Sequence, residues 1–145
     1  MRAVVQRVTE AAVRVDGELV GSIGPGLCVL VGVTHADGTA EADKLAAKLW
    51  SLRVFDDEQG RMELGADQVG AEVLVISQFT LYGDTRKGRR PSWIEAARPE
   101  QAEPLVERVA TQLRAAGATV ATGRFGAEMQ VSIVNDGPVT LIVET

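Results

Sequence analysis

Apolar and polar residues along the chain form short strand-like runs, separated by two stretches with helical spacing. The most continuous apolar run spans 27–33, which is typical of a strand covered on both faces. Alternating or β-branched runs predict further strands at 1–9, 11–15, 18–23, 53–55, 61–64, 72–82, 118–123, 130–134 and 139–143. The run 72–82 is the longest candidate for a central strand. Asp16-Gly17 predicts a hairpin turn, and Gly24-Pro25-Gly26 interrupts the pattern.

Two helices are predicted from apolar residues three and four positions apart. The first begins near Thr39, a suitable N-cap, and ends near Leu52, with an inward face of Ala42, Leu45, Ala46 and Leu49. The second runs from about Glu103-Pro104 to Ala116, with a stripe of Leu105, Val109 and Leu113 and a stop signal at Gly117. A chain of 145 residues is long enough for one domain with a substantial core. We therefore expect a single α/β domain at 1–145 that is β-rich, with a mostly antiparallel sheet or barrel and two main helices.

The net charge of −5 argues against broad binding to DNA or RNA, because such binding depends on neutralisation of phosphates by Lys and Arg. One local exception is the basic stretch around Gly88, which consists of Arg86, Lys87, Arg89 and Arg90. It is either a solvated loop or a local phosphate-binding site. No apolar run approaches the roughly 20 residues that cross a bilayer, and no signal-peptide core follows Met1. The sequence thus predicts a cytoplasmic protein without a membrane or DNA partner.

Several common catalytic systems lack the residues that they need. A nucleophilic triad needs a histidine, and the only one, His35, lies in a loop with no feature that marks it as a base. One histidine and one cysteine, Cys28, cannot supply the usual ligands of zinc. The glycine-rich segment 21–26 lacks the Gly-Lys-Ser/Thr ending of a phosphate-binding loop. We therefore expect neither a metal nor a nucleotide cofactor.

Two polar segments at strand ends carry the remaining chemistry, Ser77-Gln78-Phe79-Thr80-Leu81-Tyr82 and Asn135-Asp136-Gly137-Pro138-Val139-Thr140. Proline fixes its own φ and glycine adopts dihedrals that other residues avoid, so the Gly137-Pro138 pair presents carbonyls at a fixed angle. The hydroxyls of Ser77 and Thr80 have no base nearby in the sequence. They either satisfy backbone groups at the strand end or serve an ester cleavage in which backbone amides stabilise the oxyanion and the substrate supplies a hydroxyl.

The segments SQFTLYGD and VNDGPVT closely resemble the two signature motifs of the D-aminoacyl-tRNA deacylases, and the resemblance extends from the initial MRAVVQRV to the last residues. It implies that Ser77, Gln78, Phe79 and Thr80 form the catalytic pocket, with the amides of Phe79 and Thr80 facing the oxyanion. It also implies that Gly137 and Pro138, supported by Arg7 and Thr140, act as a chirality gate in the pocket of the other subunit of a homodimer. Phe125 and Met129 match positions that help bind the terminal adenosine, or else they pack in the core.

The activity implied by this resemblance is hydrolysis of the ester between a D-amino acid, or mischarged glycine, and the 3′-terminal adenosine of tRNA. L-Aminoacyl-tRNA would be rejected by the gate. The Thr80 hydroxyl is either a nucleophile or a positioning group. Two alternatives stay open: a general esterase with Thr80 as the covalent nucleophile, and a noncatalytic module that binds the end of tRNA.

Overall fold

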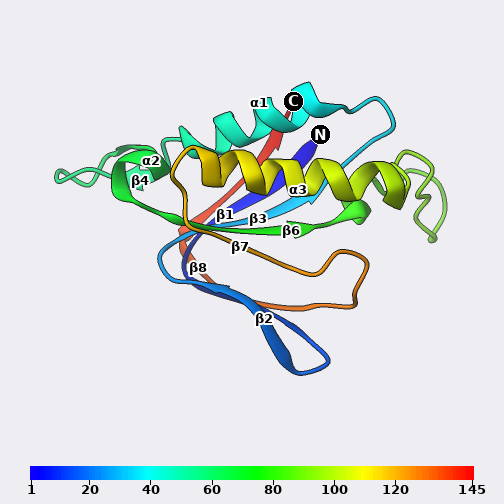
Figure 1. Cartoon of the computed structure of the whole chain (residues 1–145), viewed down its shortest axis with the longest axis horizontal. Coiled ribbons are helices and arrows are strands. Elements are labelled where there is room, and N and C mark those ends of the chain that lie inside the picture. Colours follow the sequence, from blue (N-terminus) through cyan, green and yellow to red (C-terminus); the bar gives the residue numbers. More distant parts are fainter.

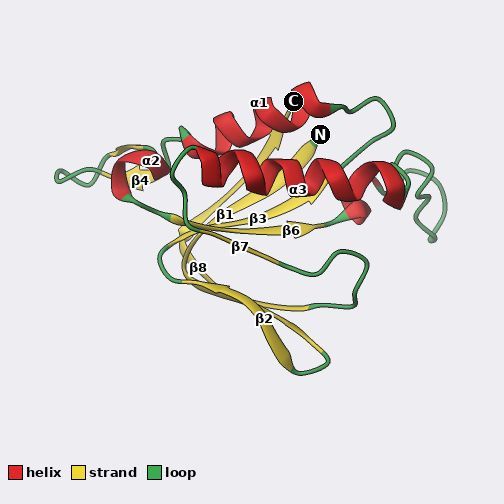
Figure 2. Ribbon diagram, viewed as in Figure 1, coloured by secondary structure: helices red, strands yellow, loops and turns green.

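Two long helices cover one face of the sheet in the computed structural model, which describes residues 1–145. α1 (Thr39–Trp50) and α3 (Pro99–Ala115) lie side by side over the strands (Figures 1 and 2). An ion pair joins them, with Nε of Arg108 2.6 Å from Oδ1 of Asp43. This helical layer matches the two main helices predicted from the apolar stripes.

The sheet is mixed and strongly curled. Its order is β2-β1-β3-β6-β7, and β8 pairs with β1. The strands are β1 (Arg2–Val15), β2 (Glu18–Ile23), β3 (Gly26–Gly32), β6 (Glu72–Ser77), β7 (Val120–Thr122) and β8 (Gln130–Glu144). β1 pairs antiparallel with β2, β3 and β8, whereas β3, β6 and β7 are parallel to one another. The predicted β-rich α/β class is confirmed, with a larger parallel part than expected.

The long strand β1 serves two different neighbours along its length. Residues 2–8 pair with β3 and residues 11–15 pair with β2, while β8 follows almost all of β1. β2 then folds over toward β7, where a Cβ on Gly21 would lie 2.6 Å from the carbonyl oxygen of Thr122. The absence of a side chain at Gly21 thus lets the sheet curl toward closure (Figure 1).

Apolar side chains form one large cluster between the helices and the sheet and a smaller cluster on the opposite face. The large cluster includes Val29, Leu45, Leu49 and Leu113, all fully buried. Truncation of such a leucine to alanine costs about 2–5 kcal/mol. The smaller cluster includes Cys28, as its apolar run predicted, and burial raises the pKa of the Cys28 thiol to about 11. None of the helices has both the length and the apolar character that crossing a membrane requires.

Both ends of the chain lie together at the helical side of the sheet (Figure 1). The α-ammonium group of Met1 donates to Oδ1 of Asp37 at 2.7 Å and to the carbonyl oxygen of Thr145 at 3.0 Å. The second carboxylate oxygen of Asp37 accepts from the amide of Thr34 at 2.8 Å. These contacts fix the segment that follows β3 against β1.

Several predicted element boundaries are wrong. The strands expected at 1–9 and 11–15 form the single strand β1, because β8 pairs along almost its whole length. The first helix is capped by Gly38 rather than by Thr39, because the Glu41 carboxylate accepts from the Gly38 amide at 2.8 Å. The second helix begins at Pro99 instead of Glu103, since proline at the first helical position needs no donor. The two last predicted strands form one strand, β8, with an irregular register near Asn135 rather than a separating turn.

The smaller elements lie beside α1. β4 (Phe55–Asp56) and β5 (Met62–Leu64) form the hairpin predicted from the turn between them. A short helix that the pattern did not predict, α2 (Ala66–Val69), precedes β6.

Candidate active site

The predicted catalytic segment lies where β6 ends and the chain turns. Ser77 pairs with Val31 of β3, and the amide of Gln78 donates to the carbonyl oxygen of Val31 at 2.7 Å. The predicted strand 72–82 does not continue, because β3 ends at Gly32 and offers no further partner. A 3₁₀ helix, η1 (Phe79–Tyr82), follows instead. Ser77 and Gln78 are therefore half-buried at the strand end, and Phe79 and Thr80 are exposed.

The turn brings the polar groups of this segment together. The side-chain amide of Gln78 donates to the hydroxyl oxygen of Thr80. Because Phe79 and Thr80 begin η1, their amides have no acceptor within that helix. Two adjacent donors at a strand end can stabilise an oxyanion.

Two residues that the sequence analysis did not select hold η1 in place. Arg2 donates from Nη1 to the carbonyl oxygen of Leu81 at 2.8 Å, and its guanidinium carbon lies 4.9 Å from the centre of the Tyr82 ring. Gly32 allows close packing, since a Cβ there would lie 3.1 Å from the carbonyl oxygen of Gln78. Neither residue lies in the two signature motifs, and only the fold places them under the catalytic segment.

A pocket of about 600 Å³ opens beside Ser77 and Gln78. Its walls are mostly apolar and include Phe125 and Met129, so the structure brings the predicted adenosine-binding residues next to the predicted catalytic segment. The exposed rings of Phe79 and Trp93 form an edge-to-face pair in its lining, with centroids 5.4 Å apart. A planar base fits such a setting, because aromatic side chains stack on nucleobases.

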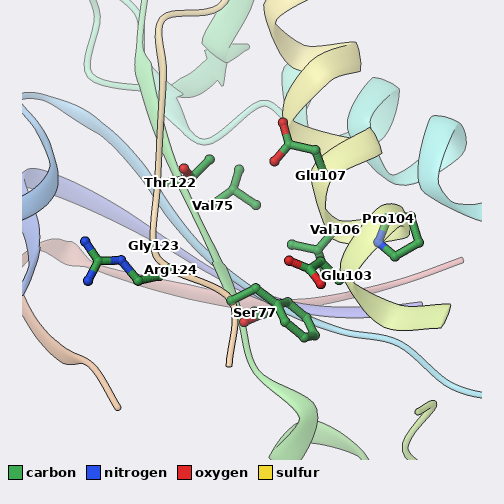
Figure 3. A pocket seen from close by; sticks show the side chains of 10 residues that line it. Val75, Ser77, Glu103, Pro104, Val106, Glu107, Thr122, Gly123 and Arg124 are labelled. Atoms are coloured by element: carbon green, nitrogen blue, oxygen red, sulfur yellow. The ribbon is translucent and has the colours of Figure 1, made fainter. Parts of the chain in front are cut away.

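A second cavity of about 590 Å³ adjoins this pocket and shares Ser77, Val106 and Phe125 with it. Figure 3 shows it between α3 and the end of β7, with Glu103 and Glu107 on the helix and Thr122 on the opposite side. The two cavities therefore lie on either side of Ser77, Val106 and Phe125.

The second motif lies on β8 and is fixed by Arg7 and Asn135. The Asn135 side chain donates to the carbonyl oxygens of Arg7 at 2.9 Å and of Val139 at 3.0 Å. The buried Arg7 has Nε 3.2 Å from Oδ2 of Asp136, without the alignment of a hydrogen bond, and Nη1 donates to the carbonyl oxygen of Val54 at 2.7 Å. These contacts hold the strand on both sides of the Gly-Pro pair.

Gly137 and Pro138 are exposed, and the peptide bond between them is cis. Gly137 has a φ of 113°, which favours glycine. Thr140 lies beside the pair, with its hydroxyl 3.4 Å from Oδ1 of Asn135. The pair therefore projects from the molecule on a well-held segment.

The two motifs do not meet within one chain. Arg7 of β1 pairs with Leu27 of β3, which pairs with Val73 of β6. Ser77 lies four residues further along β6, which corresponds to about 13 Å. In addition, β1 and β3 separate β8 from β6. Neither cavity is lined by Gly137, so a pocket that contains both motifs needs a second copy.

Comparison with known proteins identifies the family. The family model described as D-Tyr-tRNA(Tyr) deacylase matches residues 4–144. A D-aminoacyl-tRNA deacylase from Streptomyces coelicolor is 63% identical over 145 residues, covering 99% of this chain and 99% of that protein. The chain belongs to the D-Tyr-tRNA(Tyr) deacylase family. The predicted family is confirmed, and with it the prediction that the chain is an enzyme of the deacylase class.

Solved structures agree with this assignment of a deacylase fold. A structure described as a probable eukaryotic D-amino acid tRNA deacylase has a TM-score of 0.86 at 15% identity over 99% of this chain and 98% of its own, which shows a shared fold. A structure described as c-Myc DNA Unwinding Element Binding Protein has a TM-score of 0.94 at 42% identity, covering 100% of this chain and 99% of its own. This deacylase-family chain thus shares its fold with proteins of different descriptions.

The basic stretch of this deacylase-family chain lies on an exposed loop. Arg86 is paired with Asp84, with Nη2 2.7 Å from Oδ2. Hydrogen bonds from the Arg86 side chain and amide lower the pKa of the Asp84 carboxyl to about 2. No ion pair engages Lys87, Arg89 or Arg90. Three of the four predicted phosphate contacts are therefore free to bind an anion, and Arg86 is already occupied.

The only histidine has a structural contact. Nε2 of the exposed His35 lies 2.7 Å from the carbonyl oxygen of Ile94. His35 does not line either cavity of this deacylase-family chain. No three His, Cys, Asp or Glu side chains gather in a group that could hold a metal ion.

Proposed function

We propose that this chain hydrolyses the ester between a D-amino acid, or mischarged glycine, and the 3′-terminal adenosine of tRNA. The products are the free amino acid and intact tRNA. The observation that carries the proposal is the Ser77-Gln78-Phe79-Thr80 turn at the edge of a mostly apolar pocket of about 600 Å³, in a chain of the deacylase family. The reaction belongs in the cytoplasm, where translation uses aminoacyl-tRNA.

The chemistry follows from the groups at the end of β6. The amides of Phe79 and Thr80 stabilise the oxyanion that forms when water attacks the ester carbonyl. Ser77 and Gln78 orient the substrate, because their side chains are half-buried beside the pocket. No histidine or carboxylate lines this pocket, so the hydroxyl next to the scissile bond of the substrate assists the attacking water.

The pocket accounts for binding of the terminal nucleoside. Phe125 and Met129 supply an apolar surface for the adenine base, next to the half-buried Ser77. Burial of a flat aromatic base against such side chains is favourable through stacking and loss of apolar surface from water. The ester then lies at the Gln78 end of the same pocket.

A homodimer would complete the site. β8 pairs only with β1, so its other edge is free, and it exposes five large apolar residues: Val131, Ile133, Val134, Leu141 and Ile142. An exposed apolar strand edge of this length is a surface for pairing with another chain. The exposed Gly137-Pro138 pair lies on the same strand. We therefore place this pair in the pocket of the partner.

The gate would select chirality by exclusion. The carbonyls of Gly137 and Pro138 form a wall where the side chain of an L-aminoacyl group would lie. Overlap and unpaired polar groups reject that substrate, while glycine or a D-side chain pointing elsewhere is accepted. Arg7, Asn135 and Thr140 support the wall through the contacts described above.

A matched pair of substrates tests this proposal. D-Tyr-tRNA and L-Tyr-tRNA are incubated with the purified chain, and release of tyrosine is measured. We expect rapid hydrolysis of D-Tyr-tRNA and no enzyme-dependent hydrolysis of L-Tyr-tRNA at the same concentration. Binding of D-Tyr-tRNA without turnover would instead identify a noncatalytic module that binds the end of tRNA.

A general esterase is distinguished by a substrate that ends in 2′-deoxyadenosine. Such an esterase hydrolyses it with an accumulating acyl-enzyme, whereas the proposed mechanism loses most of its rate. The description of one similar structure names DNA binding for that protein. A net charge of −5 does not favour DNA binding by this chain.

A further inference from the structure

One charged residue lines the pocket beside Ser77 and Gln78, and it is Arg98. The other lining residues are neutral, and most of them are apolar. The Arg98 side chain makes no hydrogen bond or ion pair with the chain, unlike Arg2 and Arg108, which are both paired with carboxylates. Arg98 is exposed at the edge of this pocket. An unpaired guanidinium at that place can bind an anionic group of a ligand that enters the pocket.

The backbone of Arg98 is fixed relative to the catalytic segment. The amide of Ala97 donates to the carbonyl oxygen of Val33 at 2.9 Å, just beyond β3. The carbonyl oxygen of Arg98 accepts from the amides of Gln101 and Ala102 at 3.0 and 2.9 Å, which starts α3. Val31 of β3 holds Gln78, and Val33, the first residue after β3, holds the residue before Arg98. The backbone that carries the guanidinium group is therefore held in place relative to the catalytic segment.

We propose that Arg98 binds the phosphodiester on the 5′ side of the terminal adenosine. This inference rests on the proposed function. An aminoacyl-adenosine at the end of tRNA has an ester at one end and a phosphate at the other. The pocket has two polar regions that correspond to these groups. Ser77 and Gln78 correspond to the ester, and Arg98, at the start of α3, corresponds to the phosphate. Binding of the phosphate at Arg98 sets how far the nucleotide enters and so aligns the ester with Gln78.

This site differs from the basic loop at 86–90. None of the loop residues lines the pocket, so the loop can contact only phosphates that lie outside it. Arg98 is predicted to bind the single phosphate nearest the reacting bond. A guanidinium can donate two parallel hydrogen bonds to a phosphate, which a lysine cannot reproduce.

The test uses two stable inhibitors that differ only by that phosphate: 3′-(D-alanylamino)-3′-deoxyadenosine and its 5′-monophosphate. Their inhibition constants are measured against hydrolysis of D-Tyr-tRNA. We expect the 5′-monophosphate to bind at least about tenfold more tightly to the wild-type enzyme, as for a charge-assisted hydrogen bond. In Arg98→Ala the two constants become nearly equal, and in Arg98→Lys the preference is only partly retained.

Two control variants separate specific from general effects. Arg14→Ala removes the same charge from an exposed position at the β1–β2 hairpin and should keep the preference for the 5′-monophosphate. Arg124→Ala removes the arginine that lines the adjoining cavity of Figure 3. A loss of the preference in Arg124→Ala but not in Arg98→Ala would overturn the proposal, because the phosphate would then lie in that cavity.

Other outcomes also decide the matter. Equal binding of the two inhibitors to the wild type, or failure of both to inhibit an active enzyme, overturns the role of Arg98. If the wild type does not hydrolyse D-Tyr-tRNA at all, the proposed function fails. Calorimetric titration of the same two inhibitors then still measures whether Arg98 recognises the phosphate.

Discussion

The side-chain amide of Gln78 donates a hydrogen bond to the hydroxyl oxygen of Thr80. The Thr80 oxygen is therefore an acceptor in this structure, and its hydrogen-bond partner is an amide rather than a histidine or carboxylate that could act as a base. A threonine hydroxyl without a base is a poor nucleophile. This relationship makes Thr80 a positioning group and leads to the first prediction.

Thr80→Ala should retain most of the deacylase activity. We expect kcat/KM for D-Tyr-tRNA to fall by less than about twofold, whereas loss of a true nucleophile costs several orders of magnitude. Single-turnover and steady-state assays measure the change, and circular dichroism checks the fold. A fall on the order of 10⁴-fold in a folded variant would assign the covalent role to Thr80.

Gly137→Ala should weaken chiral selection. A Cβ at this position would lie 3.0 Å from Nη2 of Arg7 and 2.9 Å from Cγ2 of Val139, and the φ of 113° strains any other residue. We expect a loss of about 1–3 kcal/mol in the free energy of unfolding. The ratio of kcat/KM for D- and L-Tyr-tRNA should fall as well.

Gly24→Ala is the matched control for that variant. A Cβ on Gly24 meets no atom within 4 Å, so both stability and chiral selection should stay close to the wild type. If Gly137→Ala folds, hydrolyses D-Tyr-tRNA and rejects L-Tyr-tRNA as strictly as the wild type, the gate lies elsewhere.

Replacement of Lys87, Arg89 and Arg90 by alanine should raise KM for tRNA and leave kcat nearly unchanged, because phosphate contacts position the substrate without changing the reacting bond. The slope of log KM against log salt should fall by about 0.7 for each phosphate that the loop no longer neutralises. Arg86→Ala should have a smaller effect, since Arg86 is already bound to Asp84. Lys44→Ala, at an exposed position on α1, is the charge-matched control for the single Arg86→Ala change. An unchanged salt slope in the triple variant would show that the loop residues are solvated and bind no phosphate.

Acidification should release the start of the basic loop. Hydrogen bonds from the Arg86 side chain and amide lower the pKa of Asp84 from 3.8 to about 2. Because the pKa is lower in the folded chain, this pairing contributes stability above pH of about 4, and the contribution is lost as the pH falls toward 2. An NMR titration should place the midpoint of Asp84 near 2, and Arg86→Ala should move it back toward 3.8. A wild-type midpoint near 3.8 would contradict the pairing.

Ile142→Glu should separate the proposed dimer. Ile142 is 70% exposed on β8, and a charge on a strand edge opposes pairing with another chain. Light scattering should show a folded monomer with little deacylase activity that recovers partly at high protein concentration. Leu19→Glu, on a 47% exposed position of β2, should remain dimeric and active. An active monomer would refute completion of the pocket by a partner.

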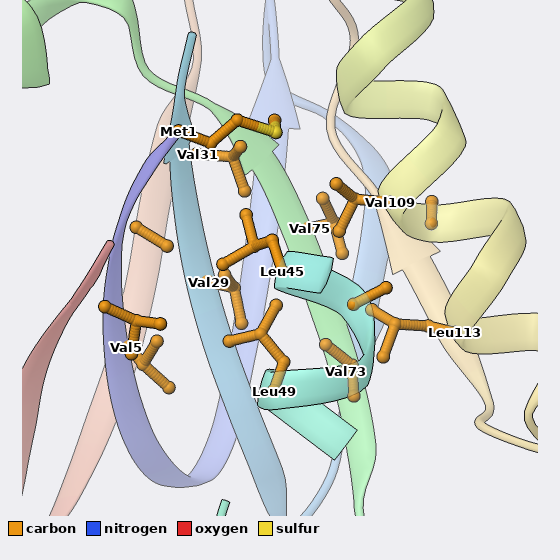
Figure 4. Packing of buried hydrophobic residues seen from close by; sticks show 14 of the residues in the cluster. Met1, Val5, Val29, Val31, Leu45, Leu49, Val73, Val75, Val109 and Leu113 are labelled. Carbon is orange, nitrogen blue, oxygen red and sulfur yellow. The ribbon is translucent and has the colours of Figure 1, made fainter. Parts of the chain in front are cut away.

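The core was predictable because its pattern is local. Leu45 and Leu49 share one face of α1 and pack on Val29 and Val31 of the continuous apolar run, as Figure 4 shows. Helical spacing and an uninterrupted apolar strand are both visible in the sequence. These two features alone predict a helix on a covered sheet.

The end of β6 was not predictable in the same way. Phe79, Leu81 and Tyr82 continue an apolar pattern that fits a strand, but a strand needs a partner. β3 ends at Gly32, and the polar Arg2 fixes the turn from another strand. Arg98 was missed for a related reason, since only the folded start of α3 brings it to the pocket. Such contacts join residues far apart in the chain, and no local pattern records them.

The strand β1 fixes the distance between the two motif segments. Arg2 on this strand holds η1, and Arg7, five residues along, holds the segment that carries Gly137. Five residues of extended chain measure about 17 Å. In the proposed dimer, each active site would combine η1 of one subunit with the Gly137-Pro138 gate of the other. One β1 strand would therefore hold the η1 segment of one active site and the gate of the second active site. An insertion or deletion of one residue between Arg2 and Arg7 would therefore misalign two reaction centres at once, although neither centre would lose a single functional group.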